Sequence, residues 1–394
     1  MNKRLKIVQI IKGLDIGGDS GGAELFGVKL ARELKNEFDC DVWLCAYYAV
    51  HTDTEKQWME TLNREGIKTF FVSEWGGTNN IEKFTKGLLN LISMIRREKV
   101  DVVHSHFQLG TLAAVLLKSL GLTKVAVRTS HIRQEWNKGR WTWFLFPVFI
   151  NRIFPSILDA EVGVSRAVCE YLVSRPGKRV KASKVHLIYN GIDIQEIKNQ
   201  ALQPLSLADQ SFFSEDRVYI GAVGRLAEQK GYPYLIKAML DVQKIIPTCE
   251  LIVVGDGELH DELVTLCSDL GLSNVVRFMG LRKNVPALMT HMGLFVLSSL
   301  WEGLPTVVIE AMACGLPVIA TDIPGTRELV QNGVTGLLVA EKDADALSNA
   351  IIDVLTNAER QKVFVSNAEK AIWKYDMRVI GNAYWDLYQC LRRD

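Results

Sequence analysis

The strongest constraint on the fold is a repeated alternation of short apolar strands with amphipathic helices. The apolar run Lys6–Ile11 is followed by a Gly-rich loop and a helical pattern over Ala23–Leu34, and the alternation continues to about Thr129. A second series begins at Val218–Val223 and ends at Pro317–Thr321. Strands that alternate with helices of this length are typical of parallel βαβ units. The chain is therefore expected to be an α/β protein with two doubly wound, Rossmann-like domains.

The boundary between the two domains is predicted at Asn199–Asp216, which is rich in Gln, Ser, Asp and Pro and has no periodic apolar pattern. We assign residues 1–198 to an N-terminal domain and residues 199–374 to a C-terminal domain. The helical stretch at about 375–394 has more aromatic residues than one exposed helix needs, so it is expected to pack back on the N-terminal domain. A chain of 394 residues is long enough for two separate cores.

Composition excludes several classes of protein. Apolar residues make up 48% of the chain and charged residues 23%, as in an average soluble globular protein. No apolar run reaches the ~20 residues of a membrane-spanning helix, and the N-terminus lacks the pattern of a signal peptide, so a cytoplasmic location is expected. The seven scattered cysteines contain no C-x-x-C pair, which favours core packing over disulfides or zinc. Nucleic acid is not expected among the partners.

Basic charge is concentrated in residues 128–184, where 11 Lys and Arg residues face 4 Asp and Glu residues. The basic side chains Arg133, Lys138, Arg140 and Arg152 alternate there with aromatic ones. The aromatic residues are Trp136, Trp141, Trp143, Phe144, Phe146, Phe149 and Phe154. Rings and long basic side chains together suit an element in the headgroup region of a membrane. The pattern predicts peripheral binding to an anionic membrane surface, with an aromatic core helix as the alternative.

The Gly-rich loop Gly17–Gly22 lies between the first strand and the first helix. Glycines let the backbone approach a ligand, and the following helix N-terminus offers N–H groups to an anion. The loop does not fit the G-x-G-x-x-G pattern of dinucleotide-binding proteins. A ligand-binding loop and a plain surface turn both remain open for this segment.

Two cations, Arg225 and Lys230, follow the strand Tyr219–Val223. Ligands of open α/β sheets bind at the carboxyl ends of the strands, so these side chains are placed to hold a phosphate or diphosphate. Two carboxylates follow another strand end: Glu302 in a turn, and Glu310 on a helix among apolar residues. A carboxylate in such surroundings is costly unless a ligand or partner satisfies it, so both are expected to face one pocket.

Together these residues resemble the retaining nucleotide-sugar glycosyltransferases of family 4, which have the GT-B fold of two Rossmann-like domains with a cleft between them. Glu302 and Glu310 form the E-x7-E pattern of that family, and Gly224–Gly231 and Gly21–Glu24 match two of its loops. The resemblance covers nearly the whole chain. Further matching segments are Asp101–His106, Val164–Ser165, Asn190–Asp193, Val254–Gly257 and Pro324–Leu329.

The resemblance implies transfer of a sugar from a nucleoside-diphosphate sugar to a glycan or polyprenyl-linked acceptor, with retention of configuration and without a metal or cofactor. Arg225 and Lys230 would bind the donor diphosphate, assisted by backbone N–H groups after Glu302, at Gly303 and Leu304. Glu310 would bond the ribose hydroxyls.

The resemblance further implies that Glu302 holds hydroxyls of the donor sugar and that His106 lies beside the reacting bond. Gly21 and Gly22 would close the N-terminal side of the cleft. His104, inside the strand, is expected to be a hydrogen-bonded core residue.

Competing interpretations rest on other features. Asp39-Cys40-Asp41 and Asp343-Ala344-Asp345 have the D-x-D form of metal-dependent glycosyltransferases, but they fall at the start of a strand and of a helix, where Asp commonly caps and faces solvent. A nucleotide-sugar epimerase on the same fold would need an additional acid–base pair. A non-catalytic nucleotide-sugar-binding subunit of a glycan assembly complex would not need all four charged residues of the cleft.

Overall fold

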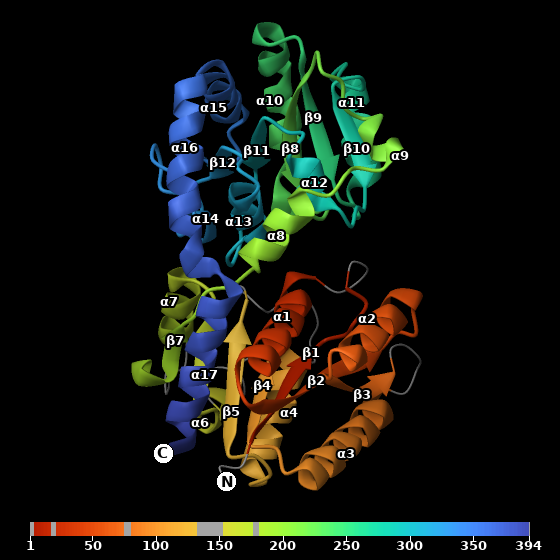
Figure 1. The fold of residues 1–394 in the computed structure, drawn as a ribbon, viewed down its shortest axis with the longest axis vertical. Coiled ribbons are helices and arrows are strands. Elements are labelled where there is room, and N and C mark those ends of the chain that lie inside the picture. Colours follow the sequence, from red (N-terminus) through yellow and green to blue (C-terminus); the bar gives the residue numbers. More distant parts are fainter. Residues whose placement is uncertain (1–3, 17–20, 75–79, 132–152, 176–180, 394) are drawn as a thin grey trace. The chain divides into compact units, whose positions relative to one another are not determined.

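The computed structural model describes residues 4–16, 21–74, 80–131, 153–175 and 181–393. The chain forms two compact units (Figure 1). Unit 1 comprises Met1–Gly191 and Met377–Asp394, and unit 2 comprises Ile192–Asp376. Each unit is an α/β domain with one parallel sheet, which confirms the predicted fold class.

Unit 1 is built on a seven-stranded parallel sheet of order β3-β2-β1-β4-β5-β6-β7. Its strands are β1 (Leu5–Ile11), β2 (Cys40–Ala49), β3 (Lys68–Glu74), β4 (Val102–Ser105), β5 (Val125–Ser130), β6 (Ala160–Gly163) and β7 (Val185–Leu187). Its helices are α1 (Gly22–Glu37), α2 (Asp53–Arg64), α3 (Asn80–Glu98), α4 (Gln108–Ser119), α6 (Phe154–Ile157), α7 (Arg166–Ser174) and α17 (Met377–Arg393), with a 3-10 turn at Ala182–Lys184.

The sheet of unit 1 has one apolar core on each face because successive side chains of a strand point to opposite sides. Ile7 and Ile11 of β1 pack with α1, α2 and α17, whereas Val8 and Ile10 pack with α3 and α4. Strands buried on both faces read as nearly continuous apolar runs, which explains why β1 stands out in the sequence.

Unit 2 is built on a six-stranded parallel sheet of order β10-β9-β8-β11-β12-β13. Its strands are β8 (Val218–Val223), β9 (Cys249–Val254), β10 (Val276–Gly280), β11 (Leu294–Leu297), β12 (Val318–Thr321) and β13 (Leu337–Val339). Its helices are α8 (Ile194–Ala201), α9 (Leu207–Gln210), α10 (Tyr232–Ile245), α11 (His260–Asp269), α12 (Val285–Met289), α13 (Thr306–Ala313), α14 (Pro324–Arg327), α15 (Ala344–Thr356) and α16 (Ala358–Ala371), with 3-10 turns at Glu228–Lys230 and Ile372–Tyr375.

The units divide after Gly191, not after residue 198 as the sequence suggested. Ile192 donates its N–H to the Tyr375 carbonyl over 3.0 Å and forms a parallel bridge with Asp376, so both crossings of the chain lie together. The segment 199–216, expected to be a linker, contains the end of α8 and all of α9. Asp209 of α9 pairs with Arg282 over 2.8 Å, which fixes this segment on unit 2.

Helix α17 packs against α1 and β5 of unit 1. Tyr384 and Tyr388 are fully buried there, and Trp385 stacks on Phe38 with ring centroids 4.5 Å apart. At Gly381 a Cβ atom would lie 2.4 Å from Cγ of Glu33, so the helix approaches α1 closely at this glycine. These contacts account for the aromatic excess of the C-terminal stretch.

Some of the described side chains in the basic region 128–184 are buried rather than exposed. Arg128 and Arg175 are buried and both pair with the buried carboxylate of Glu161, Arg128 at 3.3 Å. Phe154 is buried against Ala126 and Leu158. These three side chains are therefore not available to a membrane surface, because the core of unit 1 uses them. The other aromatic residues of the predicted membrane element, with Arg133, Lys138, Arg140 and Arg152, lie outside the described residues.

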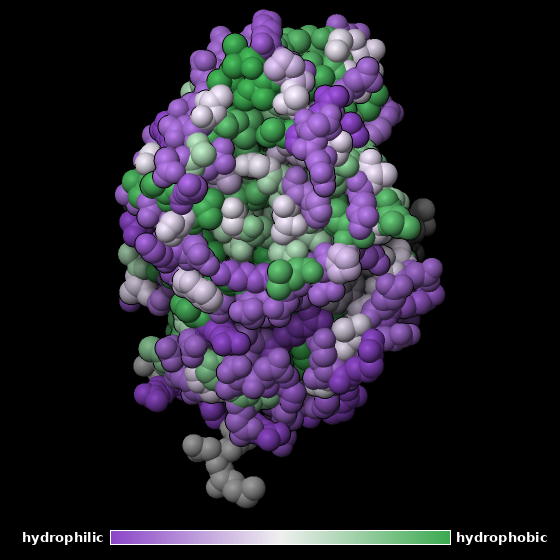
Figure 2. Space-filling model, turned by 45° about the horizontal axis from the view of Figure 1, so that its top comes forward, coloured by the Kyte–Doolittle hydropathy of each residue, from purple (hydrophilic) through white to green (hydrophobic). Residues whose placement is uncertain are grey.

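Within the described ranges no helix combines the length and apolar character needed to cross a bilayer. On the face shown in Figure 2, apolar residues gather in separate patches between polar ones. Of the two D-x-D sequences, Asp343 caps α15 by accepting the Ala346 N–H over 2.8 Å, and Asp39 pairs with Arg4 in solvent at 2.6 Å. The capping interpretation of Asp343 is confirmed.

Candidate functional site

The loop after β8 in unit 2 carries Lys230 on a tight backbone path. Gly224 and Gly231 have φ values of 153° and 61°, in the region that favours glycine. A Cβ atom at Gly231 would lie 2.3 Å from the carbonyl oxygen of Ser298, and one at Gly224 would lie 3.0 Å from Cε of Lys230. Gly231 thus lets this loop pack directly on the loop after β11, and Gly224 leaves room for the side chain of Lys230.

Lys230 and Glu302 form a largely buried ion pair between these two loops. The Lys230 ammonium donates to Oε1 of Glu302 over 2.6 Å, with side chains 16% and 10% exposed. Ser299 donates its hydroxyl to the same oxygen over 2.9 Å, and Gln229 donates its amide to Oε2 over 3.1 Å. Glu302 therefore has three donors and a fixed orientation, as expected of a carboxylate that positions a ligand.

Arg225 lies on the same loop but has a different partner. Its guanidinium contacts the Glu258 carboxylate through Nη2 at 3.0 Å and Nε at 3.1 Å, and the two side chains are 72% and 53% exposed. An exposed ion pair of this kind contributes about 0–1 kcal/mol, so Arg225 can exchange Glu258 for an anionic ligand at little cost. Glu258 could not be identified from the sequence, because its contact with Arg225 depends on how the β9–α11 loop folds.

The remaining predicted donor residues lie between β11 and α13. Gly303 and Leu304 are buried, and a Cβ atom at Gly325 of α14 would lie 2.9 Å from the carbonyl oxygens of both Glu302 and Gly303. The close approach of α14 therefore restricts the position of this loop. Glu310 is half-buried on α13, beside the buried Ile309 and Ala311.

His106 directly follows β4 in unit 1 and is buried. Its Nε2 atom lies 2.7 Å from Oε1 of Gln9, and its Nδ1 atom lies 3.4 Å from Nε2 of His131. The Gln9 oxygen can only accept, so the proton of the His106 ring resides on Nε2 and Nδ1 keeps its lone pair. Gln9 in β1 was not singled out from the sequence, because a glutamine inside an apolar strand carries no motif.

A buried hydrogen-bond network connects this histidine to α17. Gln9 donates its amide to the Tyr388 hydroxyl over 3.2 Å, and that hydroxyl is 2.7 Å from Nδ1 of His104. Nε2 of His104 is 2.8 Å from Oγ1 of Thr129, which is 2.8 Å from the hydroxyl of Tyr384. His104 is a hydrogen-bonded core residue, as predicted.

Burial determines the protonation state of these rings. Desolvation lowers the pKa of His104 to about 3 and the pKa of His131 to about 4. It lowers the pKa of His106 well below its ordinary value, and the neighbouring His104 and His131 add to this effect. All three rings are neutral at neutral pH.

Gly21 and Gly22 lead into α1 near this cluster. The Gly21 N–H donates to the Glu24 carboxylate over 2.9 Å, and no atom would contact a Cβ at Gly22 within 4 Å. One turn further along α1, the ring of Phe26 packs edge-on against His106 with centroids 5.8 Å apart. The structure thus brings the second turn of α1 and His106 together within unit 1. Residues 17–20 of the predicted loop lie outside the described residues.

Comparison with known proteins identifies the family. Residues 20–196 match the model described as Glycosyltransferase Family 4, and residues 206–371 match the model described as Glycosyl transferases group 1. The chain belongs to the family 4 glycosyltransferases. The two matched regions contain strands β2 to β7 of unit 1 and all six strands of the unit 2 sheet, so the predicted family resemblance is confirmed.

Individual relatives agree with this assignment. An uncharacterized glycosyltransferase of Methanocaldococcus jannaschii is 40% identical over 259 residues, which are 63% of this chain and 62% of that protein. The UDP-Gal:alpha-D-GlcNAc-diphosphoundecaprenol alpha-1,3-galactosyltransferase of Escherichia coli is 27% identical over 303 residues, 74% of this chain and 75% of the relative. The matches thus span about 60% to 75% of the length of these two relatives.

Solved structures of glycosyltransferases share the fold. Anabaena HepE in complex with UDP and glucose matches with a TM-score of 0.79 at 21% identity, over 98% of this chain and 100% of HepE. Sucrose-phosphate synthase from Thermosynechococcus elongatus matches with a TM-score of 0.79 at 20% identity, over 98% of this chain and 99% of the synthase. At these identities the likeness shows the fold, which is GT-B.

The buried histidines predict a pH dependence of stability. Their pKa values are lower in the folded chain than the ordinary value of about 6.5 in the unfolded chain, so below about pH 6.5 the unfolded chain binds more protons. The free energy of unfolding of unit 1 should therefore fall as the pH falls from 6.5 to 5, by about 1.4 kcal/mol per pH unit for each such histidine. His106→Gln should reduce this slope in chemical denaturation. The control His260→Gln, which changes an exposed ring of unit 2, should leave it unchanged, and equal slopes for wild type and His106→Gln would contradict the expectation.

Proposed function

We propose that the chain is a retaining glycosyltransferase that moves a sugar from a nucleoside-diphosphate sugar to a glycan or polyprenyl-linked acceptor without a metal ion. The observation that carries the proposal is the buried Lys230–Glu302 pair, which joins two strand ends in unit 2. The name of the E. coli relative, with a UDP-sugar donor and a diphosphoundecaprenol acceptor, supports both substrate classes.

The donor diphosphate is assigned to Lys230 and Arg225. An ammonium group has three protons, so Lys230 can keep its bond to Glu302 and still donate to a phosphate oxygen. Arg225 adds an exposed guanidinium whose pairing with Glu258 is weak. Fixed cations at this position stabilise the charge that develops on the departing diphosphate, which is the role a divalent metal has in other enzymes.

The donor sugar and ribose are assigned to the two glutamates. Ionised Glu302 offers about four lone-pair sites and uses three of them on Lys230, Ser299 and Gln229, so one remains for a sugar hydroxyl. The carboxylate of Glu310, on α13, accepts hydrogen bonds from the ribose hydroxyls. The backbone N–H groups of Gly303 and Leu304 face the diphosphate in this proposal.

The transfer step is proposed to occur on one face of the donor sugar. The acceptor hydroxyl oxygen bonds to C1 as the bond from C1 to the phosphate oxygen breaks, and the acceptor proton passes to an oxygen of the leaving diphosphate. No carboxylate nucleophile is required, and C1 retains its configuration. Neutral His106 lies beside the reacting bond in this proposal, with its Nε2 proton engaged by Gln9 and its Nδ1 atom 3.4 Å from Nε2 of His131.

Peripheral membrane association belongs to the same proposal. An acceptor carried on a polyprenyl diphosphate lies at a membrane surface, and residues 133–152 supply the basic and aromatic side chains that such a surface binds. A cytoplasmic chain that binds the inner face of the plasma membrane fits these requirements.

Lys230→Ala should lower turnover by on the order of 10², because the developing charge on the diphosphate loses a buried cation. The assay is slow hydrolysis of UDP-glucose, UDP-galactose, UDP-GlcNAc and UDP-GalNAc, followed by UDP release. Lys237→Ala, which removes an exposed cation from α10, should behave as wild type. Near-normal turnover in Lys230→Ala, with intact near-UV circular dichroism, would overturn the assignment.

The same hydrolysis reaction tests whether activity needs a metal ion and whether the configuration at C1 is retained. Activity should persist in excess EDTA, and NMR should detect the α-anomer of the released sugar before mutarotation. Activity that EDTA abolishes and Mg²⁺ or Mn²⁺ restores would contradict metal independence. A β-anomer as first product would contradict retention.

Substitution of the two glutamates should affect different quantities, UDP affinity for Glu310 and turnover for Glu302. Glu310→Gln should weaken UDP binding about tenfold in calorimetry, since a ribose hydroxyl loses a charged acceptor. Glu302→Gln should leave UDP affinity nearly unchanged and lower turnover, because its contact is with the sugar. Identical losses of UDP affinity in both variants would argue against this division.

Membrane binding is tested by flotation with vesicles of phosphatidylglycerol and phosphatidylcholine. Wild-type protein should float at low salt and float less at high salt, and reversal of Arg133, Lys138 and Arg140 to Glu should abolish flotation. Reversal of Lys237, Lys244 and Lys362 to Glu, which are exposed on unit 2, serves as the matched control. Wild-type protein that stays at the bottom of the low-salt gradient would favour a soluble acceptor.

A further inference from the structure

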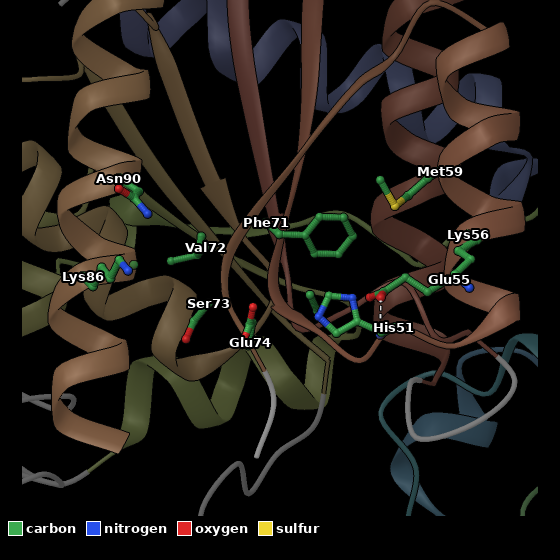
Figure 3. Close-up of a pocket in the computed structure, with 12 residues that line it drawn as sticks. His51, Glu55, Lys56, Met59, Phe71, Val72, Ser73, Glu74, Lys86 and Asn90 are labelled. Atoms are coloured by element: carbon green, nitrogen blue, oxygen red, sulfur yellow. Dashed lines mark hydrogen bonds between the residues drawn. The ribbon is translucent and has the colours of Figure 1, made fainter. Parts of the chain in front are cut away.

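Unit 1 contains a cavity of about 660 Å³ that none of the residues discussed above lines. It lies around the carboxyl end of the edge strand β3 and is bounded by α2 and α3 (Figure 3). Its volume falls in the ~300–1,000 Å³ range of small-molecule sites. The family assignment gives this cavity no role.

One wall of the cavity is apolar and the rest is polar. Phe71 of β3 presents its ring to the cavity, with Met59 of α2 nearby (Figure 3). Ser73 and Glu74 line it from the end of β3, and Asn90 lines it from α3. Hydroxyl, carboxylate and amide groups thus surround an aromatic face.

His51 is fixed at the edge of this cavity in a strained backbone conformation. Its φ of 62° lies in the left-handed region, which costs a non-glycine residue about 1–2 kcal/mol. The buried carboxylate of Glu55 accepts the N–H of His51 over 2.6 Å and the N–H of Val50 over 3.0 Å (Figure 3). The Thr52 hydroxyl donates to Asp15 over 2.7 Å, which holds the same loop from the other side. Strain that a buried carboxylate maintains is a frequent property of ligand sites.

The lining chemistry favours an uncharged ligand with many hydroxyl groups. Donors and acceptors are mixed, with a carboxylate at Glu74, an ammonium at Lys86 and neutral groups at Asn90 and Ser73. Sugar hydroxyls both donate and accept, and the C–H face of a sugar ring packs on an aromatic ring such as Phe71. Carboxylates at Glu55 and Glu74 are matched by ammonium groups at Lys56 and Lys86, so the lining has no excess charge that selects an ionic ligand. A purely apolar ligand would leave these polar groups without partners.

The cavity lies at the same edge of the sheet as His106. His51 follows β2 and His106 follows β4, with only β1 between these two strands. Two strand spacings amount to about 10 Å. The cavity lies around the end of β3, one spacing further on, so a ligand in it is about 14 Å from the histidine along the edge where ligands of open α/β sheets bind.

We propose that this cavity is a saccharide subsite, which binds neutral sugar units of the acceptor glycan beyond the unit that is modified. The proposal rests on the proposed glycosyltransferase function and adds to it the chemistry of the acceptor. Phe71 supplies the stacking face, and His51, Glu74 and Asn90 supply the hydrogen bonds.

The test uses the full chain and a panel of neutral disaccharides: N,N′-diacetylchitobiose, lactose, cellobiose and maltose. In saturation-transfer NMR at least one should receive saturation from the wild-type protein. Asn90→Trp, which fills the cavity from an exposed helix position, should reduce that signal at least tenfold. Leu89→Trp places the same side chain at the neighbouring exposed position of α3, outside the cavity, and should leave the signal unchanged.

Absence of saturation transfer for the whole panel, or equal signals for the two variants, would overturn the subsite. Thermal stabilisation by UDP is measured in the same samples, because it reports on unit 2. Stabilisation by UDP without any disaccharide signal would overturn the subsite and leave the proposed function intact. A disaccharide signal that only Asn90→Trp removes, without stabilisation by UDP, would support a saccharide site and overturn the donor assignment.

Discussion

The parallel arrangement of the strands determines where the chemistry of this chain is located. Right-handed βαβ connections make the strands of a sheet parallel, so the carboxyl ends of all strands lie along the same edge. Residues far apart in sequence become neighbours at that edge. Lys230 follows β8 and Glu302 follows β11, and because these strands are adjacent, an ion pair forms across 72 positions of sequence. The Leu300 N–H donates to the Gln229 carbonyl over 2.7 Å, which fastens the two loops to each other.

The candidate site side chains at the carboxyl ends of the strands are charged in unit 2 and neutral in unit 1. Unit 2 presents a charged pair with Lys230 and Glu302, which suits a ligand that carries and then gains negative charge. Unit 1 presents imidazoles that burial keeps neutral, in a network of hydroxyl and amide groups. A neutral ring can orient a hydroxyl without competing for the phosphate. The division of charge between the units matches a reaction in which the charged leaving group and the polar acceptor are held by different residues.

The alternation of strands and helices, the fold class and the family could be predicted from the sequence, because buried strands and loop motifs are local features. The hydrogen bond between Gln9 and Tyr388 could not be predicted from the sequence, since 379 positions separate the two residues and neither belongs to a motif. Net charge was misleading for Arg128 and Arg175, because a count of charges does not reveal that both side chains are buried and pair with Glu161 in the core. The segment 199–216 looked like a linker because it has no apolar periodicity, whereas in the structure the Asp209–Arg282 ion pair and contacts of the Phe213 ring with Tyr219 and His291 hold it on unit 2.

The position of α17 in the sequence has a consequence for biosynthesis. Residues 1–191 are synthesised before unit 2. Tyr384 and Tyr388, which are buried in the core of unit 1, are synthesised only after all of unit 2. During that interval His104 lacks its Tyr388 partner, and the apolar faces of α1 and β5 are uncovered. Unit 2 can fold as a contiguous piece of chain, whereas unit 1 must wait for a segment encoded 185 residues later. Nascent chains should therefore expose these apolar faces until α17 has been made, and exposed apolar surface of this kind is what chaperones bind.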